Sequence, residues 1–451
     1  MSEDQKIAAK PGAEGNGIDF DAFKIELLKD YQLCCESREA SLLGRKEVLT
    51  GKAKFGIFGD GKEVAQVAMA KCFQNGDFRS GYYRDQTFMF ASELATHQQF
   101  FAQLYADPRL EADPFSGGRQ MNAHFATRSL DENGDWKILA DQKNCAADLS
   151  PTGSQMARAV GLANASKYYR QNWGLGDFTQ FSKEGNEVCF ATIGDASTSE
   201  GLFWEAINAA GVSKIPLAVF VWDDGYGISV PRKYQTTKDS ISKVLKGFEF
   251  DEDGGLRLYQ AKAWDYAQMC QVFSEGIAAI RETHVPAVFH IQDCTQPQGH
   301  STSGSHERYK SEERLAWEIE FDGIRKTREW ILENGIAAEE ELDSIEGEAK
   351  KKIRTAQKAA WKSFLVPIQN QLDRAMAHFE EVEAESANAE VVRAEKEKLK
   401  SALDPVRKDV VAATKEVLRA TRSENISSRE RLSSYLNELL DEAADQFSSH
   451  L

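Results

Sequence analysis

The feature that most limits the fold of this chain is the alternation of short apolar runs with longer helical segments between residues 150 and 297. Three runs have the composition of buried strands, and the segments between them have helical spacing. The predicted strands are 187–193, 216–222 and 286–294, and the predicted helices are 150–170, 199–214 and 263–284. Strands joined by helical crossovers form a parallel sheet with helices on its faces. We therefore predict an α/β fold with a doubly wound, mostly parallel sheet, which binds ligands at the carboxyl ends of its strands.

The rest of the chain is predicted to be mainly helical. Residues 18–49 have the spacing of a helix, and residues 113–125 are typical of a loop. After residue 310 the sequence predicts several long helices, interrupted mainly by Pro367 and Pro405 and without a sustained heptad repeat, so packed helices or a linker are favoured over a free coiled coil. The expected parts are a flexible N-terminal arm at 1–17, one α/β domain at 18–350 and a helical tail or linker at 351–451.

Composition excludes several classes of function. The formal net charge is -16, and no stripe of Lys and Arg is present, so nucleic acid is not an expected partner. The polar N-terminus resembles neither a signal peptide nor a membrane span, and no membrane association is expected. The seven cysteines form no Cys-x-x-Cys pair and no zinc spacing. We expect reduced, mostly buried thiols and a cytoplasmic location.

Two carboxylates follow neighbouring predicted strands. Asp195 comes directly after the first strand, and Asp224 follows the second. The segment Ser197–Glu200 matches a capping box, which predicts a helix start beside Asp195 that could bind a phosphate. The carboxylates would repel a phosphate unless a cation lay between them. Mg²⁺ could fill this position, because it binds both carboxylate and phosphate oxygens. The alternative is that both aspartates only begin turns and cap helices.

Six segments together resemble the α subunit of the decarboxylating first component of the 2-oxo acid dehydrogenase complexes. The pair GDASTSEGLFWEAINAAG and IPLAVFVWDDGYGIS resembles the thiamine diphosphate motif, which usually begins G-D-G and ends N-N. The other matching segments are 80–86, 117–125, 150–167 and 299–313. They follow the order of the family and span roughly residues 20 to 350. The resemblance implies the thiamine diphosphate-binding fold.

The resemblance assigns roles at the metal and diphosphate end of the cofactor. Asp195 and Asp224 would bind Mg²⁺ together with the main-chain carbonyl of Tyr226. Arg84 would reach the phosphate oxygens, for which a guanidinium offers forked donors; its alternative role is a surface ion pair with Asp85. The other residues implied around the diphosphate are Tyr83, Gly194, Ala196, Ser197 and Gly227.

The segment before the helix at 150–170 matches the pyrimidine side of the cofactor. Ser150 and Thr152 occupy the corresponding positions. Ser150, Pro151, Ser154 and Gln155 also match a monovalent-cation site of the branched-chain relatives. The same Ser-Pro-Thr-Gly sequence is equally a plain helix entry, so both interpretations stay open.

His300 is the implied catalytic residue. It lies in GHSTS, which matches the mobile loop of the family, where the histidine contacts the cofactor and assists reaction at the bound substrate. An imidazole suits proton transfer near neutral pH. Ser301 and Ser303 match serines that regulatory kinases modify in some relatives, but the sequence does not establish that regulation here.

The sequence departs from the family pattern at three places. The N-N doublet is Asp223–Asp224, which gives the metal a second carboxylate in place of an amide. Trp222 stands where branched-chain relatives carry an arginine that helps to hold the diphosphate. Gln296 stands where relatives have an arginine, which puts the anchoring of the His300 loop in doubt.

The resemblance implies oxidative decarboxylation of a small 2-oxo acid with transfer of the acyl group to a lipoyl arm. The carboxylate that activates the pyrimidine ring comes from the β subunit in this family, so a β-type partner, separate or fused, and a lipoyl acyltransferase are expected. The sequence favours a branched-chain 2-oxo acid. Pyruvate or acetoin is the alternative substrate, and a non-catalytic assembly protein on the same fold is the alternative function.

Overall fold

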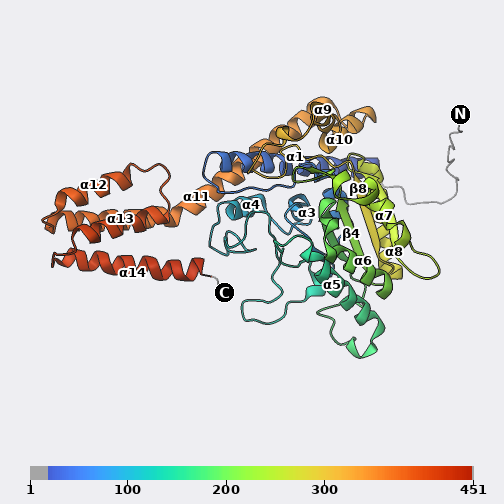
Figure 1. Ribbon diagram of the computed structural model, residues 1–451, viewed down its shortest axis with the longest axis horizontal. Coiled ribbons are helices and arrows are strands. Elements are labelled where there is room, and N and C mark those ends of the chain that lie inside the picture. Colours follow the sequence, from blue (N-terminus) through green and yellow to red (C-terminus); the bar gives the residue numbers. More distant parts are fainter. Residues whose placement is uncertain (1–18, 449–451) are drawn as a thin grey trace.

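The structure is a computed structural model that describes residues 19–448. Its centre is a six-stranded sheet with the order β2-β1-β3-β4-β8-β7, in which every neighbouring pair of strands is parallel (Figure 1). The predicted parallel α/β sheet is therefore confirmed. The arm expected at residues 1–17 lies outside the described residues.

The three apolar runs predicted as strands form the centre of the sheet, as β3, β4 and β8. The strands are β1 Phe78–Ser80, β2 Asn144–Cys145, β3 Cys189–Gly194, β4 Leu217–Trp222, β7 Arg257–Lys262 and β8 Ala287–Gln292, with β5 Tyr226–Gly227 and β6 Val230–Pro231 as a separate antiparallel pair. The sequence did not predict β1, β2 and β7. Two of them are only two or three residues long, and β7 is mostly half-buried, so none has a long apolar run.

Helices cover both faces of the sheet. On one face, α5 and α6 pack against β3 and β4 around Phe203 and Ile193; on the other, α2 and α8 pack around Phe190, Phe220 and Phe289. The α-helices are α1 Phe20–Leu49, α2 Glu63–Ala70, α3 Gln86–Ala91, α4 His97–Leu104, α5 Ser154–Gln171, α6 Gly201–Ser213, α7 Ile241–Val244, α8 Tyr266–Thr283, α9 Glu312–Glu320, α10 Gly323–Glu333, α11 Glu339–Glu385, α12 Ala389–Lys400, α13 Arg407–Ala420 and α14 Ser427–Phe447.

The register of the central strands brings their carboxyl ends to one edge. Gly194 pairs with Trp222, and the amide of Asp195 donates to the carbonyl of Trp222 at 3.1 Å. The amide of Asp223 in turn donates to the carbonyl of Ile291 in β8 at 2.9 Å. The residues that follow β3 and β4 therefore lie side by side, at the edge where parallel sheets bind ligands.

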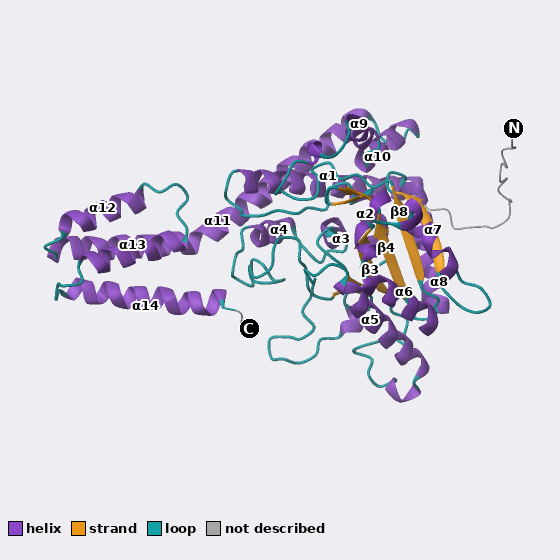
Figure 2. Cartoon of the chain, viewed as in Figure 1, coloured by secondary structure: helices purple, strands orange, loops and turns teal. Residues whose placement is uncertain are grey.

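The C-terminal helices form a second core. The first half of α11 packs on the α/β part through Ile353 and Ala360, while its second half packs with α12, α13 and α14 around Phe379 and Val382. The helical tail extends away from the sheet (Figure 2). The prediction that Pro367 interrupts the helices was wrong, because α11 continues through it. The domain boundary near residue 350 stays a prediction; α11 passes that position unbroken.

The predicted capping box is absent. A 3-10 turn at Ala196–Ser199 follows β3, and α6 begins only at Gly201, where no side chain caps it. The hydroxyl of Thr198 donates instead to the carbonyl of Asp195 at 2.6 Å, which closes the short turn. The predicted loop at 113–125 is confirmed.

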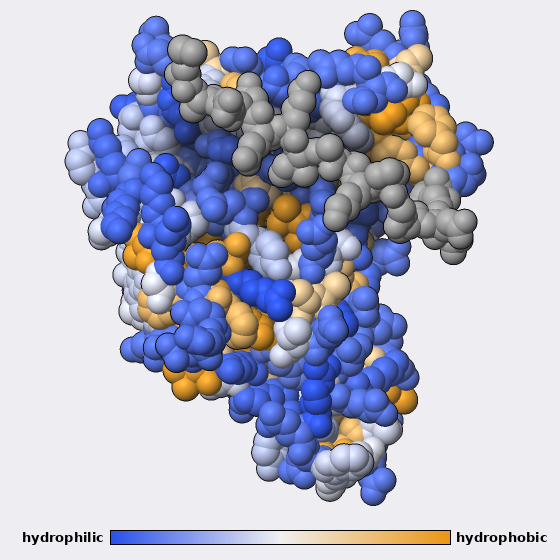
Figure 3. Space-filling model, turned by 90° about the vertical axis from the view of Figure 1, so that its right-hand side faces the viewer, coloured by the Kyte–Doolittle hydropathy of each residue, from blue (hydrophilic) through white to orange (hydrophobic). Residues whose placement is uncertain are grey.

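The surface and the cysteines agree with the compositional analysis. The face on the right of Figure 1 is mostly hydrophilic, and its apolar side chains form only small separate patches (Figure 3). Across residues 19–448, no helix has both the length and the apolar character needed to cross a membrane. All seven cysteines are free thiols, and five of them are buried, as predicted.

Candidate functional site

A pocket of about 480 Å³ lies at the carboxyl ends of β3 and β4. The loop after β1, the entry to α5, the turn after β3, the β5 hairpin and the loop after β8 all contribute to its wall. The structure brings together all the site residues expected from the sequence, and these are Tyr83, Arg84, Ser150, Thr152, Gly194, Asp195, Ala196, Ser197, Asp224, Tyr226, Gly227 and His300.

Asp195 is a buried carboxylate without a compensating partner. It is 3% exposed, and among residues 19–448 its Oδ2 atom has no hydrogen-bond partner. Burial, together with the charges of Asp223 and Asp224, raises the pKa of Asp195 well above its usual value. A buried charge is costly unless it is paired, so this carboxylate is suited to binding a cation.

Asp224 lines the pocket and is compensated by a lysine. The ammonium of Lys62 donates to Oδ2 of Asp224 at 2.9 Å, and the amide of Tyr226 donates to Oδ1 at 3.1 Å. Burial opposes ionisation, but the charge and the hydrogen bond of Lys62 outweigh it and lower the pKa of Asp224. Arg314 donates to the main-chain carbonyl of Asp224 at 2.7 Å, which fixes the turn leading to Tyr226.

Asp223 has different partners and does not line the pocket. Its Oδ2 atom accepts a hydrogen bond from Nε2 of His290 at 2.7 Å and forms an ion pair with Arg232. Burial again opposes ionisation, yet His290 and then Arg232 lower the pKa of Asp223. The two neighbouring aspartates are therefore separated, with only Asp224 facing the pocket.

Close packing at Gly227 shapes the part of the pocket between the turn after β3 and the β5 hairpin. Gly227 lies against the turn after β3, and a Cβ atom there would come within 2.7 Å of the Cβ of Ala196 and 2.5 Å of the Gln235 side chain. A larger residue at position 227 would push the β5 hairpin away from Ala196 and Ser197. The glycine at position 227 therefore allows the β5 hairpin and the turn after β3 to approach closely.

Arg84 points into the site and makes no ion pair with Asp85. It is 4% exposed, its Nη1 atom donates to the carbonyl of Phe58 at 2.5 Å, and its guanidinium lies 5.0 Å from the centre of the Tyr83 ring. Asp85 instead binds Arg79 through two hydrogen bonds of 2.9 and 2.7 Å. The alternative of a surface ion pair for Arg84 is therefore wrong, because Asp85 is buried and already paired.

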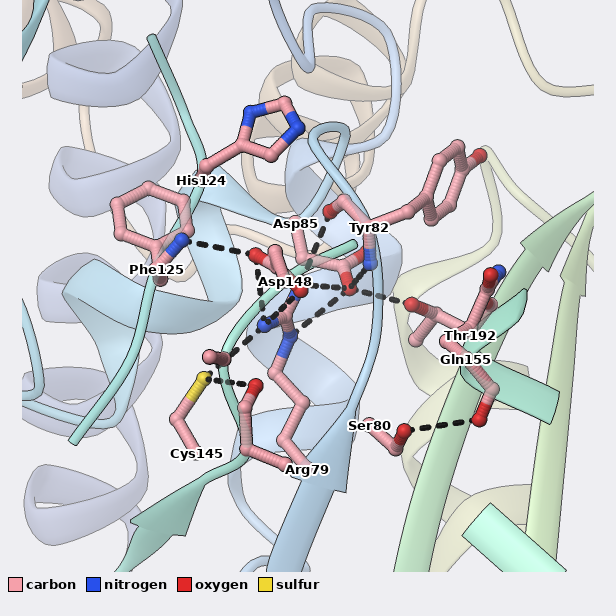
Figure 4. A network of polar contacts seen from close by, with 12 residues as sticks. Arg79, Ser80, Tyr82, Asp85, His124, Phe125, Cys145, Asp148, Gln155 and Thr192 are labelled. Atoms are coloured by element: carbon pink, nitrogen blue, oxygen red, sulfur yellow. Dashed lines mark hydrogen bonds and ion pairs between the residues drawn. The ribbon is translucent and has the colours of Figure 1, made fainter. Parts of the chain in front are cut away.

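A buried polar network holds the loop that carries Tyr83 and Arg84 (Figure 4). Arg79 lies between Asp85 and Asp148, and the hydroxyl of Thr192 in β3 also donates to Asp85. The indole N–H of Trp222 donates to the other oxygen of Asp85 at 3.2 Å. Trp222 therefore stabilises the loop through Asp85, and its indole N–H donates to Asp85 and not into the pocket.

The entry to α5 contributes Ser150 and Thr152. The hydroxyl of Ser150 lies 3.2 Å from Nε2 of His124. Two of the residues matched to a monovalent-cation site form hydrogen bonds within the protein. Ser154 donates to the carbonyl of Pro151 at 2.7 Å, and the side-chain amide of Gln155 donates to a carbonyl of β3 at 2.9 Å. A monovalent cation here stays a prediction.

His300 faces Tyr83, with the two rings 6.4 Å apart and at 75°. Burial, followed by the charge of Arg84, lowers the pKa of His300 to about 4, so the imidazole is neutral at pH 7. Arg45 holds its loop through the carbonyls of Gln298 at 3.0 Å and Ser301 at 3.2 Å. The loop is therefore anchored, although Gln296 replaces the arginine of relatives.

Two lysines at this site were missed by the sequence reasoning. Lys62 bonds to Asp224 and to the base of the His300 loop. Lys310 lines the pocket and donates to Glu318 at 2.7 Å; burial lowers its pKa. The position of Lys62 between a glycine-rich turn and the fully buried helix α2 was a usable signal, but nothing in the sequence around Lys310 distinguishes it from a surface lysine.

The donor set fits a divalent cation that binds a diphosphate. Between residues 19 and 448, no group of three or more His, Cys, Asp or Glu side chains could hold a metal on its own. Asp195 and Asp224 supply two carboxylates, and Mg²⁺ typically takes one or two carboxylates and completes its shell with phosphate oxygens and water. Arg84 and Lys310 supply positive charge on the same pocket wall.

Comparison with known proteins gives a family match over most of the chain. The model of the family described as dehydrogenase E1 component matches residues 43–367. The 2-oxoisovalerate dehydrogenase subunit alpha of Bacillus subtilis (strain 168) is 26% identical over 325 residues, which cover 70% of this chain and 87% of the relative. The mitochondrial 2-oxoisovalerate dehydrogenase subunit alpha of Caenorhabditis elegans is 27% identical over 314 residues, or 69% of this chain and 64% of the relative.

Relatives with a different substrate in their name match with similar identity over a shorter part of the chain. The pyruvate dehydrogenase E1 component subunit alpha of Rickettsia bellii (strain RML369-C) is 26% identical over 204 residues, or 45% of this chain and 56% of the relative. The chain thus spans less than two thirds of the length of the nematode and rickettsial relatives. The family model covers well over half of the chain, and the chain belongs to the dehydrogenase E1 component family, as a member of its alpha type.

Proposed function

We propose that this chain is the α half of a thiamine diphosphate-dependent 2-oxo acid dehydrogenase, which decarboxylates a branched-chain 2-oxo acid and passes the acyl group to a lipoyl arm. The observation that carries the proposal is the pocket that gathers all twelve expected residues around the buried, unpaired carboxylate of Asp195. Family membership gives the reaction class, and the pocket supplies side chains that suit it.

In this proposal the chain holds the diphosphate end of the cofactor. Asp195, Asp224 and the carbonyl of Tyr226 would bind Mg²⁺, and Arg84 would donate to phosphate oxygens. Bound thiamine diphosphate would supply the nucleophilic carbon that adds to the keto group and the ring that accepts electrons as CO₂ leaves. The close approach of Gly227 to Ala196 would shape the wall around the phosphates.

His300 would transfer protons at the substrate. Its imidazole is neutral at pH 7 because its pKa is about 4, so it can accept a hydrogen bond or a proton from the reacting group. Its ring lies against Tyr83, which borders the same pocket, and the anchored loop restricts its position. These contacts would keep the imidazole directed at the reacting atoms.

The site also suits completion by a β-type partner. The described residues that line the pocket include two aspartates but no glutamate. The carboxylate that activates the pyrimidine ring would come from the partner, and a lipoyl acyltransferase would receive the product. We further propose a cytoplasmic location, which the seven free thiols support.

Pyruvate is the second candidate substrate. The Rickettsia relative named for pyruvate is as similar in identity to this chain as the relatives named for 2-oxoisovalerate. Steady-state kinetics with pyruvate and with branched-chain 2-oxo acids would separate the two candidates. The size of the pocket determines how kcat/KM changes with the size of the substrate side chain. A higher kcat/KM for pyruvate would overturn the branched-chain assignment.

Calorimetry tests the cofactor assignment. The full chain, mixed with its β-type partner, is titrated with thiamine diphosphate in the presence and absence of MgCl₂. We expect binding that requires Mg²⁺ and is lost in Asp195→Ala, while the circular dichroism spectrum is unchanged. No binding by the wild type with its partner present would support the non-catalytic assembly protein instead.

A further inference from the structure

Lys62 is buried next to the pocket, and its ammonium group donates hydrogen bonds to three acceptors there. The residue is 1% exposed. Its Nζ atom donates to Oδ2 of Asp224 at 2.9 Å, to the carbonyl of Thr295 at 2.9 Å, and to Oε1 of Gln296. These three acceptors match the three N–H bonds of an ammonium group. Lys62 therefore joins the carboxyl end of β4 to the base of the His300 loop.

The turn before Lys62 lies close against the base of the His300 loop. Gly61 has a φ of +84°, and a Cβ atom on it would lie 2.1 Å from the carbonyl oxygen of Thr295. Asp60 accepts hydrogen bonds from the amide of Gln298 at 2.9 Å and from the side chain of Gln296 at 3.3 Å. The segment from Asp60 to Lys62 therefore contacts the base of the His300 loop at several points. Position 61 has room only for glycine, because a Cβ atom there would meet Thr295.

The charges around the site balance in a specific way. Asp223 is compensated by Arg232 and Asp224 by Lys62, while in the described part of the chain no cationic group lies within hydrogen-bond distance of Asp195. The Lys62–Asp224 pair carries no net charge. An asparagine at position 224, as in the family motif, would also be neutral. The net charge offered to a metal is therefore that of one carboxylate in both cases.

We propose that Lys62 is a positioning residue that makes an aspartate functional at position 224, by neutralising its charge and by tying it to the His300 loop. This inference rests on the proposed thiamine diphosphate site. A carboxylate has about four acceptor positions, so Asp224 keeps lone pairs for a metal while it holds Lys62. Lys62 also replaces the missing arginine at position 296 as the group that fixes the start of the loop.

The test is a double-mutant cycle in the full chain with its β-type partner. Lys62→Gln leaves the Asp224 charge uncompensated, and we expect at least a tenfold loss of affinity for thiamine diphosphate at saturating MgCl₂. The variant Lys62→Gln with Asp224→Asn restores a neutral pair, and we expect affinity within about threefold of the wild type. Lys262→Gln is the matched control, because Lys262 pairs with Asp293 at 2.6 Å where both side chains are 40% exposed.

Two measurements separate this inference from the proposed function. A wild type that does not bind the cofactor contradicts the proposed function. A wild type that binds, with Lys62→Gln and the double variant equally weakened, overturns the charge-pair inference. Hydrogen exchange of residues 295–302 in the cofactor-free chain tests the loop contact by itself: we expect faster exchange in Lys62→Gln but not in Lys262→Gln, and unchanged exchange in both would contradict it.

Discussion

At the scale of single residues, three aspartates of identical chemistry differ only in their neighbours. Asp223 and Asp224 each have a cationic partner, which keeps them ionised, whereas Asp195 is buried with one oxygen unpaired. The unpaired carboxylate costs folding free energy in the cofactor-free chain, as buried charges do without partners. Such a cost is expected where a residue serves binding and not stability.

We expect Asp195→Asn to stabilise the cofactor-free chain and to abolish Mg²⁺-dependent cofactor binding. Removing an unpaired buried charge should raise the free energy of unfolding by about 1–3 kcal/mol at neutral pH. The pKa of Asp195 is raised in the folded state, so its ionisation destabilises the fold as pH rises above the usual aspartate value, and the gain should shrink in acid. Thermal unfolding between pH 5 and 8 measures this; a variant less stable than the wild type at pH 8 would contradict it.

We expect His300→Gln to reduce catalysis without reducing cofactor affinity. Glutamine keeps a polar side chain in the loop but cannot transfer a proton, and general acid–base catalysis typically contributes about 10²–10⁴-fold to the rate. The measurement is kcat together with the dissociation constant of thiamine diphosphate. His378→Gln, in the helical tail, is the control. A kcat within threefold of the wild type would remove His300 from the chemistry.

At the scale of elements, the sequence predicted the parts of the fold that long apolar runs specify. Strands β3, β4 and β8 are continuous buried runs and were found, whereas β1 and β2 are too short to show a period. The capping box was wrong because the turn after β3 closes through Thr198 and not through Ser197. Every site residue expected from the motifs lines one pocket, but Lys62 was missed, because its side-chain hydrogen bonds are with residues 162 or more positions away in the sequence.

The structure explains how α11 accommodates Pro367, which the spacing of residues in the sequence did not reveal. Proline has no N–H, so the carbonyl of Ser363, four residues earlier, lacks its helical partner. Arg109, from the loop after α4, donates to this carbonyl at 2.8 Å and to the Ser363 hydroxyl at 3.0 Å. The proline therefore frees an acceptor that connects the α/β part to the long helix.

We expect Pro367→Ala to stabilise α11 by about 1–3 kcal/mol, because alanine restores the helical hydrogen bond and removes the steric conflict of the ring. Arg109→Ala should then cost less in the Pro367→Ala background than in the wild type, since the Ser363 carbonyl is already satisfied. Chemical denaturation of the four chains measures the coupling. Equal costs of Arg109→Ala in both backgrounds would show that the proline does not create this contact.

At the scale of the whole molecule, α11 joins two hydrophobic cores. Ile353 and Ala360 belong to the core beneath the sheet, and Phe379 and Val382 to the core of the tail. The candidate site lies in the α/β part, at the carboxyl ends of β3 and β4. No residue of α11 to α14 lines the pocket, but the loop that carries the pocket residue Met121 also contacts the tail, because Arg119 donates to the main-chain carbonyl of Asp445 at 3.2 Å.

The buried histidines should contribute a loss of stability as the pH falls from about 6.5 toward 4. Burial lowers the pKa of His97, His284 and His300 to about 4 in each case, from the ordinary value of 6.5. Between these values the unfolded chain binds protons at the three histidines that the folded chain does not, so protonation favours unfolding. Above pH 6.5 both states are neutral and this effect is absent.

Equilibrium denaturation in urea at a series of pH values measures the dependence. His284→Gln should make the histidine contribution to the slope between pH 4 and 6.5 smaller, because it removes one of these protons; glutamine can still donate to the carbonyl of Gly185, which Nε2 of His284 contacts at 2.9 Å. The lowered pKa values of Asp223 and Asp224 act in a different window, since that stability is lost only as the pH falls below their usual values. The raised pKa of Asp195 acts in the opposite direction over the same range, so the slope of His284→Gln is compared with that of the wild type, and equal slopes would show that His284 is protonated within the fold.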